Sequence, residues 1–512
     1  MIAGAPAASN AIVPASPGAA ATGPCATLPG VTVEGPQPPS AGARSRESDT
    51  PALTADDLRR LTGGRLLRTS RRPIRGAAVD SRLIGKGQLF VALPGERTDG
   101  HEHLDEAVER GAAAFLVTRP VGASAAIGDV TIVRVTDGPT ALGAVAAGWR
   151  RRFDPLVVGV TGSIAKTSTK EAIAAVLGSV YATLKTEGNR NNEIGLPLTV
   201  LRLRPEHEAA VFEMGMYVGG EIAELARIAR PSIGVVTAVQ PVHLERIGSL
   251  EAVERAKGEL LEALPLDGTA ILNEDDPIVA AMDGRTNARV LRYGFSPTAD
   301  VRADRVASLG TKGMRFRLQT QVGEREVTIA ALGPLSVHNA LAGAAVGIAA
   351  RVPLDDIVRG LAAGWSAPHR VELVRLRGTT IIDDSYNASP ASVRAALDVL
   401  AGLPGRSVAV LGEMLELGEE HEPGHRSVGA AAAPVVDLLI VVGADARGIV
   451  EGALEAGLDL AKIHHVADAD DALEALRPRM REGDIILVKA SNGIHLDRLV
   501  DQLRLELGEV AP

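Results

Sequence analysis

Residues 156–178 read LVVGVTGSIAKTSTKEAIAAVLG. The apolar, β-branched run at the start predicts a strand, the small residues after it predict a turn, and the remainder has helical spacing that ends at Gly178. Where a strand leads through such a turn into a helix, free backbone N–H groups face an anion, Lys166 adds positive charge, and Thr167 can hold Mg²⁺. The stretch predicts a phosphate-binding loop, with a buried strand and an ordinary capped helix as the alternative.

The turn lacks the complete Walker pattern, because position 160 is Val and position 165 is Ala. It follows the shorter form G-x-x-[GA]-K-T-[ST], which by itself does not separate the two interpretations. The decision therefore depends on which other residues the fold brings to the same place.

Length and composition indicate a globular α/β protein of about three domains, since 512 residues are too many for one core. A net charge of −9 argues against a general nucleic-acid binder, although seven arginines lie between Arg59 and Arg75. The single cysteine, Cys25, excludes an internal disulfide framework and a cysteine-based zinc site. No run of 18 apolar residues and no charged signal-peptide start is present. We therefore expect a cytoplasmic protein without membrane insertion.

Four segments follow from the pattern along the chain. Residues 1–50, rich in Ala, Pro and Gly, predict a disordered tail, and residues 51–152 predict a small α/β domain. Residues 153–366 predict a central parallel-sheet domain, with strands at 156–161, 209–213, 233–237 and 269–272 and a β meander at 300–331. Residues 367–512 predict a second open, Rossmann-like α/β sheet. Its strands are expected at 379–385, 406–414, 437–444 and 484–491, and its helices at 390–401, 424–432, 469–478 and 495–507.

Charged residues follow two of the central strands. Glu213 ends an apolar strand, where an unpaired carboxylate is costly without a cation, and His243 follows the next strand. Lys257 lies on the helix after it. Each has an ordinary explanation, a core or surface histidine and a solvated lysine, but the carboxyl ends of parallel strands share one edge. Together with Thr167, Glu213 and His243 can assemble two sites for hard metal ions.

Several amides and charges could contact a ligand. The loop 186–203 carries Asn189 and Asn192, which could bind a sugar or peptide, although a turn is the simpler explanation. Asn273 and Asn339 could read adenine edges or serve as caps. In PHRVE and IIDDSYNASP, Arg370 is a candidate phosphate clamp, and Asp383 or Asp384 a ribose or metal contact, against ordinary turn chemistry.

The order of these motifs resembles the Mur ligase family. The segments that carry the resemblance are GSIAKTSTKE, TEGNRNNEIGLPLT, FEMGMYVGGEIAELARIARP, HLERIGSLEAVERAKGEL, LNEDDP, HNALA and DDSYNASP. It runs from about Thr54 to Leu507. The run AKGEL, the motif DDSYNASP and LGEMLELGEEHEPGHRSVG at 411–429 are most similar to members that add D-alanyl-D-alanine to a UDP-N-acetylmuramoyl tripeptide.

The resemblance implies a UDP-substrate-binding domain, a central ATPase and a C-terminal dinucleotide-fold domain for the incoming amine. It implies catalytic roles for Lys166, Glu213, His243 and Lys257, and metal binding by Thr167, Glu213, His243 and Lys257, with Lys257 carbamylated and two Mg²⁺ sites. It implies ATP contacts from Gly162, Ser163, Ile164, Ala165, Lys166, Thr167, Ser168, Asn273, Asn339, Arg370 and Asp383. Ser81 and Arg82, with the loop 95–101, match the uridine-diphosphate region, and Asn189 and Asn192 are further substrate candidates.

The implied activity is that of an ATP-dependent, ADP-forming amide ligase of peptidoglycan synthesis that works as a monomer through an acyl phosphate. The alternatives are a sister ligase that adds diaminopimelate or lysine, a folate or cyanophycin ligase, and a non-catalytic nucleotide-binding relative. Four positions depart from the family pattern: Ala165 replaces the usual Gly, Arg190 an apolar residue, PHR a Gly-Arg, and LVKASNG a KGSR form. If the backbone at Ala165 needs positive φ, alanine costs about 1–2 kcal/mol there.

Overall fold

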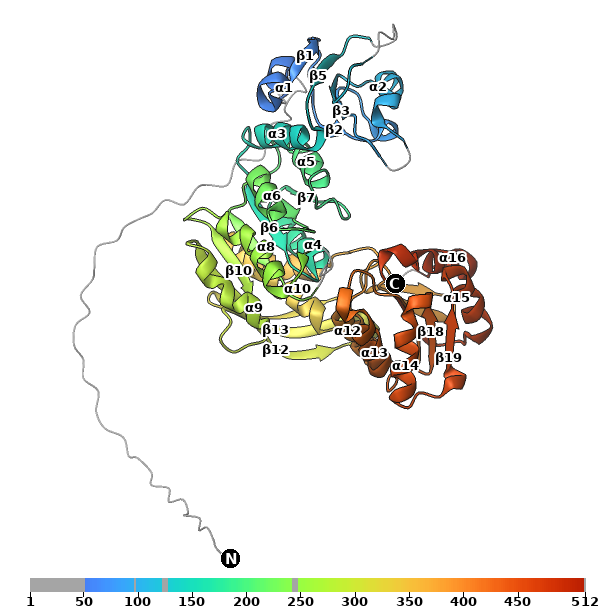
Figure 1. Ribbon diagram of the computed structural model, residues 1–512. Helices are drawn as coiled ribbons and strands as arrows, with labels where there is room; N and C mark the ends of the chain where they lie inside the picture. The colour runs from blue at the N-terminus through green and yellow to red at the C-terminus, as the bar shows by residue number, and fades with distance from the viewer. Residues whose placement is uncertain (1–50, 96–97, 122–127, 242–246, 511–512) are drawn as a thin grey trace, which may run out of the picture. The chain divides into compact units, whose positions relative to one another are not determined.

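The computed structural model describes residues 51–95, 98–121, 128–241 and 247–510 (Figure 1). The predicted tail at 1–50 lies outside them. Three β-sheets succeed one another along the chain, each within one of the three predicted α/β segments. The predicted fold class, three α/β domains with a phosphate-loop sheet in the middle, is confirmed.

The first sheet has the strand order β1-β5-β4-β3-β2, and β1 alone runs antiparallel to its neighbour. Its strands are β1 (Arg65–Arg68), β2 (Ala77–Ala78), β3 (Leu89–Val91), β4 (Ala114–Val117) and β5 (Thr131–Arg134). The helices are α1 (Ala55–Thr62), α2 (Leu104–Glu109) and α3 (Gly138–Arg150). Helix α1 begins as its sequence predicts, with Thr54 and Asp57 forming a capping box and Gly63 ending it in the left-handed conformation.

The central sheet has nine strands in the order β14-β13-β12-β11-β10-β9-β6-β8-β7, parallel from β7 to β12 and antiparallel beyond. The strands are β6 (Leu156–Thr161), β7 (Thr183–Lys185), β8 (Ala209–Glu213), β9 (Ile233–Val236), β10 (Thr269–Asn273), β11 (Arg289–Gly294), β12 (Val301–Ser308), β13 (Met314–Thr320) and β14 (Gly323–Ile329). The helices are α4 (Lys166–Gly178), α5 (Gly195–Val200), α6 (Glu221–Ala229), α8 (Leu250–Glu262), α9 (Pro277–Ala280), α10 (Pro334–Ala349) and α11 (Leu354–Ala362). The phosphate-loop strand β6 thus lies between β8 and β9.

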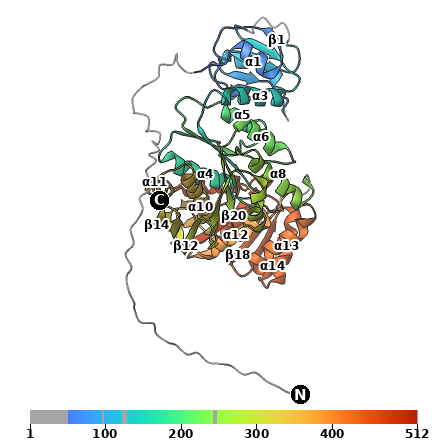
Figure 2. The same ribbon diagram turned by 90° about the vertical axis from the view of Figure 1, so that its left-hand side faces the viewer.

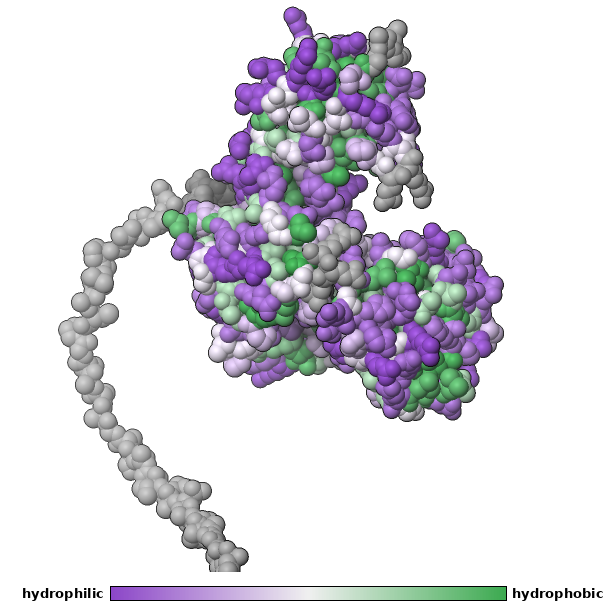
Figure 3. Space-filling view, viewed as in Figure 1, coloured by the Kyte–Doolittle hydropathy of each residue, from purple (hydrophilic) through white to green (hydrophobic). Residues whose placement is uncertain are grey.

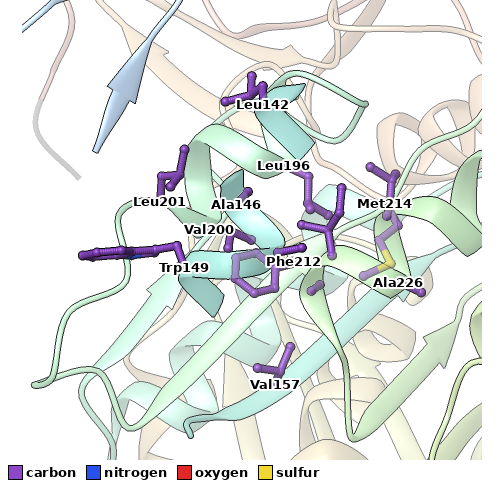
Figure 4. Close-up of a cluster of buried hydrophobic side chains, with 14 of the residues drawn as sticks. Leu142, Ala146, Trp149, Val157, Leu196, Val200, Leu201, Phe212, Met214 and Ala226 are labelled. Carbon is purple, nitrogen blue, oxygen red and sulfur yellow. The ribbon is translucent and has the colours of Figure 1, made fainter. Parts of the chain in front are cut away.

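Helices cover both faces of the central sheet, so successive strand residues enter opposite cores. In β6 and β8, Val157 and Phe212 belong to the core under α3, α5 and α6, shown in Figure 4. Their neighbours Val158 and Val211 belong to the core under α4, α10 and α11. Strands buried on both faces read as continuous apolar runs, which is why they were predictable from sequence.

The third sheet has the order β15-β16-β20-β17-β18-β19, with only β15 antiparallel. Its strands are β15 (Glu372–Leu376), β16 (Thr379–Asp383), β17 (Arg406–Gly412), β18 (Leu438–Val442), β19 (Ile463–Val466) and β20 (Asp484–Lys489). Its helices are α12 (Pro390–Ala401), α13 (His421–Ala432), α14 (Arg447–Glu455), α15 (Ala469–Leu476) and α16 (Asp497–Leu507). The four predicted helices match α12, α13, α15 and α16 within a few residues.

The prediction missed short or polar elements. Strands β7, β11, β15 and β19 and helix α14 were not predicted. Strand β19 reads IHHV and β7 has only three residues, so neither provides a long apolar signal. Pairing with a neighbour already in the sheet, rather than local propensity, makes them strands.

Polar residues cover most of the described surface in the view of Figure 3, and apolar residues form small, scattered groups. Within the described residues, no helix combines the length and the apolar character that crossing a membrane requires.

Helices α13 and α14 pack backbone to backbone, side by side in Figures 1 and 2. A Cβ atom on Gly429 would lie 2.0 Å from the carbonyl oxygen of Ile449, and one on Gly452 would lie 2.0 Å from that of Arg426. The contact is therefore reciprocal, and glycine is required on both helices.

We expect Gly429→Ala to destabilise the protein by about 1–3 kcal/mol, because backbone atoms must move to admit the methyl group. Urea-induced unfolding followed by circular dichroism measures this. Gly178→Ala is the matched control, since nothing lies within 4 Å of the corresponding Cβ position. An equal loss in both variants would contradict the packing explanation.

Candidate active site

The turn after β6 is held against the end of β9. The Thr237 hydroxyl donates to the Ile164 carbonyl at 2.6 Å, and the Ser163 backbone N–H donates to the Ala238 carbonyl at 2.8 Å. A Cβ on Gly162 would lie 1.9 Å from the Thr237 hydroxyl, so only glycine fits there. These contacts fix the conformation of the loop at the edge of the sheet.

Ala165 is the N-cap of α4 and has φ 65° and ψ 0°, the left-handed conformation. No side chain caps this end of the helix. No side chain therefore occupies the first N–H groups of α4, and residues 165–168 line a cavity, as an anion site at a helix N-terminus requires. The positive φ considered in the sequence analysis is the one observed, and alanine carries the strain.

Lys166 and Thr167 begin α4. The Lys166 ammonium donates to the Gly162 carbonyl at 2.7 Å and to the Ser163 carbonyl at 3.3 Å. Burial lowers the pKa of Lys166 from 10.5 to about 8, with Glu213 opposing the shift and Arg370 adding to it. The Thr167 hydroxyl is buried and has no hydrogen-bond partner.

Glu213 ends β8 in register with Val160 of β6. Its Oε1 accepts a hydrogen bond from the Asn191 amide at 2.8 Å, while its buried Oε2 has no hydrogen-bond partner and lies 3.8 Å from the Lys170 ammonium. A carboxylate that is 1% exposed with one oxygen unsatisfied is costly, so the site calls for a cation.

A cavity of about 470 Å³ brings these groups together. Lys166, Thr167 and Glu213 line it along with residues of the third sheet. The two buried oxygens without hydrogen-bond partners, on Thr167 and Glu213, are hard ligands of the kind that Mg²⁺ prefers. The donor set of this cavity therefore fits a magnesium ion.

Lys257 lies on α8 and is buried. Burial, with the nearby charge of Lys166, holds the pKa of the Lys257 ammonium well below its usual 10.5. His243, the other predicted metal residue, lies outside the described residues.

A second cavity, of about 480 Å³, adjoins the phosphate loop and contains both predicted adenine-side amides. The Asn339 carbonyl accepts a hydrogen bond from the Thr169 hydroxyl at 2.9 Å, and Asn273 donates to the Thr237 carbonyl at 2.8 Å. Asn339 lies inside α10 and is not a cap, whereas Asn273 also makes the turn contact to the Asp275 N–H. Ile164 and Ala165 line this cavity as well as the first, so the loop separates the two.

The third sheet contributes Arg370, whose guanidinium lies 4.0 Å above the Tyr386 ring. Both residues line the first cavity, together with Asp384. Asp383 is instead fully buried and accepts hydrogen bonds from Ser385, with His369 at 2.8 Å. The structure thus presents Asp384 rather than Asp383 to the cavity, and the nucleotide contact assigned to Asp383 stays a prediction.

The remaining candidates have local partners. The Ser81 hydroxyl donates to Glu106 at 2.6 Å and Arg82 pairs with Asp80 at 2.7 Å, both beside the first sheet. Asn189 lines the first cavity. The Asn192 side chain accepts from the Gly195 N–H at the start of α5 and, with Lys166, lines a further cavity of about 280 Å³. The described geometry does not bring Ser81 and Arg82 to the phosphate loop.

Sequence reasoning missed four residues at these cavities. Tyr386 and Lys489 line the first cavity and His338 lines the second, while Lys170 lies against Glu213. Tyr386 and His338 stood inside quoted motifs, DDSYNASP and HNALA, which was the available signal. Lys170 and Lys489 also stood inside quoted segments, GSIAKTSTKE and LVKASNG, but nothing local marks a lysine as buried.

A phosphate loop with two adjoining cavities, on a parallel sheet followed by a second α/β sheet, defines a class of nucleotide-dependent enzyme. Three Mur ligase family models match the chain: the "Mur ligase family, catalytic domain" at 73–150, the "Mur ligase middle domain" at 160–347 and the "Mur ligase, glutamate ligase domain" at 369–492. The chain belongs to the Mur ligase family.

Individual relatives agree with this. The UDP-N-acetylmuramoyl-tripeptide–D-alanyl-D-alanine ligase of Mycobacterium tuberculosis is 38% identical over 503 residues, covering 88% of this chain and 97% of its own. The crystal structure of MurF from Acinetobacter baumannii is 30% identical with a TM-score of 0.80, covering 89% of this chain and 99% of that one. The crystal structure of MurF from Thermotoga maritima in complex with ADP is 28% identical with a TM-score of 0.74, covering 84% of this chain and 97% of that one. The predictions of family and of an ATP-dependent ligase are confirmed.

We expect Ala165→Gly to stabilise the protein by up to about 1 kcal/mol, because relief of the left-handed strain exceeds the added freedom of the unfolded chain. Thermal unfolding measures this, and ADP binding should be retained. Ala174→Gly, within α4 itself, is the control and should cost about 1 kcal/mol. A loss of stability in Ala165→Gly would show that the positive φ is not the native angle.

Proposed function

We propose that this protein joins D-alanyl-D-alanine to a UDP-N-acetylmuramoyl tripeptide with cleavage of ATP to ADP and phosphate, a cytoplasmic step of peptidoglycan synthesis. The observation that carries the proposal is the pair of buried, unpartnered oxygens on Thr167 and Glu213 beside Lys166, in a cavity that residues of the third sheet also line. The names of the relatives, which cover nearly the whole chain, support the choice of substrates.

Each group of the loop has a distinct task. The N–H groups at the start of α4 and the Lys166 ammonium bind the ATP phosphates, and Thr167 and Glu213 hold Mg²⁺. The metal ion supplies charge neutralisation between the two anions that must react. Asn273 and Asn339 orient the adenine in the second cavity, and Arg370 contacts the transferred phosphoryl group from the other side. His243 is a further proposed metal ligand, and Asp384, which lines the cavity, is the nearer candidate for the contact first assigned to Asp383.

The reaction then has two steps. An oxygen of the tripeptide's terminal carboxylate attacks the γ-phosphorus of ATP. The bond between the γ-phosphorus and the β–γ bridging oxygen breaks, so that ADP is released and the tripeptide becomes an acyl phosphate. The amine of D-alanyl-D-alanine next attacks the acyl carbon, loses a proton, and expels inorganic phosphate through a tetrahedral intermediate. Lys166 stabilises the charge that develops on the phosphoryl oxygens.

Lys257 is suited to carbamylation. A neutral amine is the nucleophile that adds to carbon dioxide, and burial favours the neutral form of Lys257. Formation of the N–C bond with loss of one proton converts a cationic side chain into an anion with two oxygens. Such a group could hold a second Mg²⁺ with His243.

The first sheet and its helices, residues 51–152, would bind the uridine end through Ser81 and Arg82, with Asn189 and Asn192 further along the same substrate. The central domain at 153–366 would bind ATP, and the domain at 367–512 the dipeptide. We expect a monomer that binds no nucleic acid.

Release of ADP tests the function directly. With ATP and Mg²⁺ present, we expect turnover only when the tripeptide nucleotide and D-alanyl-D-alanine are supplied together, with the joined product identified by mass spectrometry. Product from a dipeptide nucleotide and diaminopimelate or lysine would instead identify a sister ligase. Tight ADP binding without any turnover would identify a non-catalytic relative.

The pKa of Lys166 predicts a pH dependence of ADP affinity. Because this pKa is lowered to about 8, Lys166 carries a positive charge below that pH and loses it above. The affinity for ADP should therefore weaken as the pH rises through about 8. Bound phosphates stabilise the charged form, so binding near this pH should take up a proton. Calorimetry in buffers of different ionisation enthalpy measures the uptake. Lys166→Met should bind ADP weakly and without this proton uptake, whereas the same uptake in that variant would assign it to another group.

A further inference from the structure

Lys170 is a buried cation that the proposed reaction does not use. It lies one turn after Lys166 on α4, and its side chain is 0% exposed. Three oxygens surround its ammonium: Glu171 Oε1 at 3.1 Å, the Gly188 carbonyl at 3.4 Å and Glu213 Oε2 at 3.8 Å. They come from α4, from the asparagine-rich loop and from the end of β8.

The same carboxylate of Glu171 also pairs with Lys185, which is 43% exposed. Two lysines and two glutamates thus alternate from the surface inward, in the order Lys185, Glu171, Lys170, Glu213. Because isolated charges are costly to bury, this alternation explains how Glu213 can stand beneath the phosphate loop.

The Lys170 ammonium lies nearer to the carboxylate of Glu171 than to that of Glu213. The ammonium is close to Glu171 but is beyond hydrogen-bond distance of Glu213 Oε2, which keeps its lone pairs. The gap between the two carboxylates is therefore occupied, while the unpartnered oxygen of Glu213 stays available to a ligand in the cavity that Thr167 also lines.

Without the ammonium, this gap would itself be a cation site. Two carboxylate oxygens and a backbone carbonyl are the ligands that hard divalent ions take. An ion held there would bind Glu213 on the side of Glu171, away from the phosphate loop.

We propose that Lys170 is a positioning residue that closes the gap between Glu171 and Glu213 to divalent ions, so that Glu213 binds its metal only beside Thr167. This inference rests on the proposed function, since it assumes that Glu213 holds the metal that accompanies the nucleotide. It adds a reason for a buried lysine at this position of the helix.

Binding of Mn²⁺, measured from the electron paramagnetic resonance signal of the free ion, tests the proposal with and without ADP. In the unaltered protein we expect tight Mn²⁺ binding only with ADP. In Lys170→Met we expect nucleotide-free Mn²⁺ affinity to rise about tenfold or more, because two close carboxylates lose the cation between them. The rate of ADP formation should fall in the same variant, since the ion then binds in the wrong place.

Two variants control for charge alone. Lys185→Met removes a cation from the same Glu171 carboxylate but not from the gap, so it should bind Mn²⁺ as the unaltered protein does. The double variant Lys170→Met/Glu171→Gln removes one carboxylate of the new site, so its nucleotide-free Mn²⁺ binding should be lost again. Lys170→Gln is expected to behave as Lys170→Met and serves if the methionine variant does not fold.

The outcomes separate the two proposals. If the unaltered protein binds no Mn²⁺ with ADP, the metal assignment in the proposed function is wrong and this inference falls with it. If it does bind, but the folded Lys170 variants bind Mn²⁺ as the unaltered protein does without nucleotide, only the role of Lys170 is overturned. Equal gains in Lys170→Met and Lys185→Met would also overturn it, because charge alone would then account for the effect.

Discussion

Burial of charge beneath the phosphate loop is the constraint on which the site depends. Lys170, Lys257 and Glu213 are buried in the central domain, and Lys166 is partly buried where it lines the cavity. In that environment a charge must be paired, neutralised or offered to a ligand. Glu213 faces Lys170, burial lowers the pKa of the Lys257 ammonium, and Lys166 donates to two loop carbonyls. Anionic phosphates and a divalent cation would complete this balance of charge.

The fold could be predicted largely from the sequence because the strands that organise it are buried on both faces. Runs such as 156–161 and 438–442 are long, apolar and β-branched, and their pattern needs no tertiary information. The strands that were missed owe their conformation to a neighbour. The two histidines of β19, for example, fit a strand only because β18 is already there to pair with it.

The site residues could be predicted where a sequence motif fixed both the residue type and its position. They could not be predicted where packing determines which side chain faces the cavity. Lys166, Thr167 and Glu213 meet because parallel strands bring their carboxyl ends to one edge. The choice between Asp383 and Asp384 could not be made in advance, since adjacent residues point to opposite sides of a strand. The burial of Lys170 could not be predicted either, because its partner Glu213 is 43 positions away and a helical lysine usually lies in solvent.

Ala165 has a conformation that suits an anionic ligand better than it suits the helix. A residue in the left-handed region at the N-cap turns the following N–H groups toward one point, where a phosphate can accept from them. Glycine would adopt this angle freely, and alanine, with the smallest side chain of the others, retains about 1–2 kcal/mol of strain. Loop contacts through Thr237 and Ser163 hold the backbone against that strain. The loop therefore stands preformed, and a nucleotide need not supply the energy to shape it.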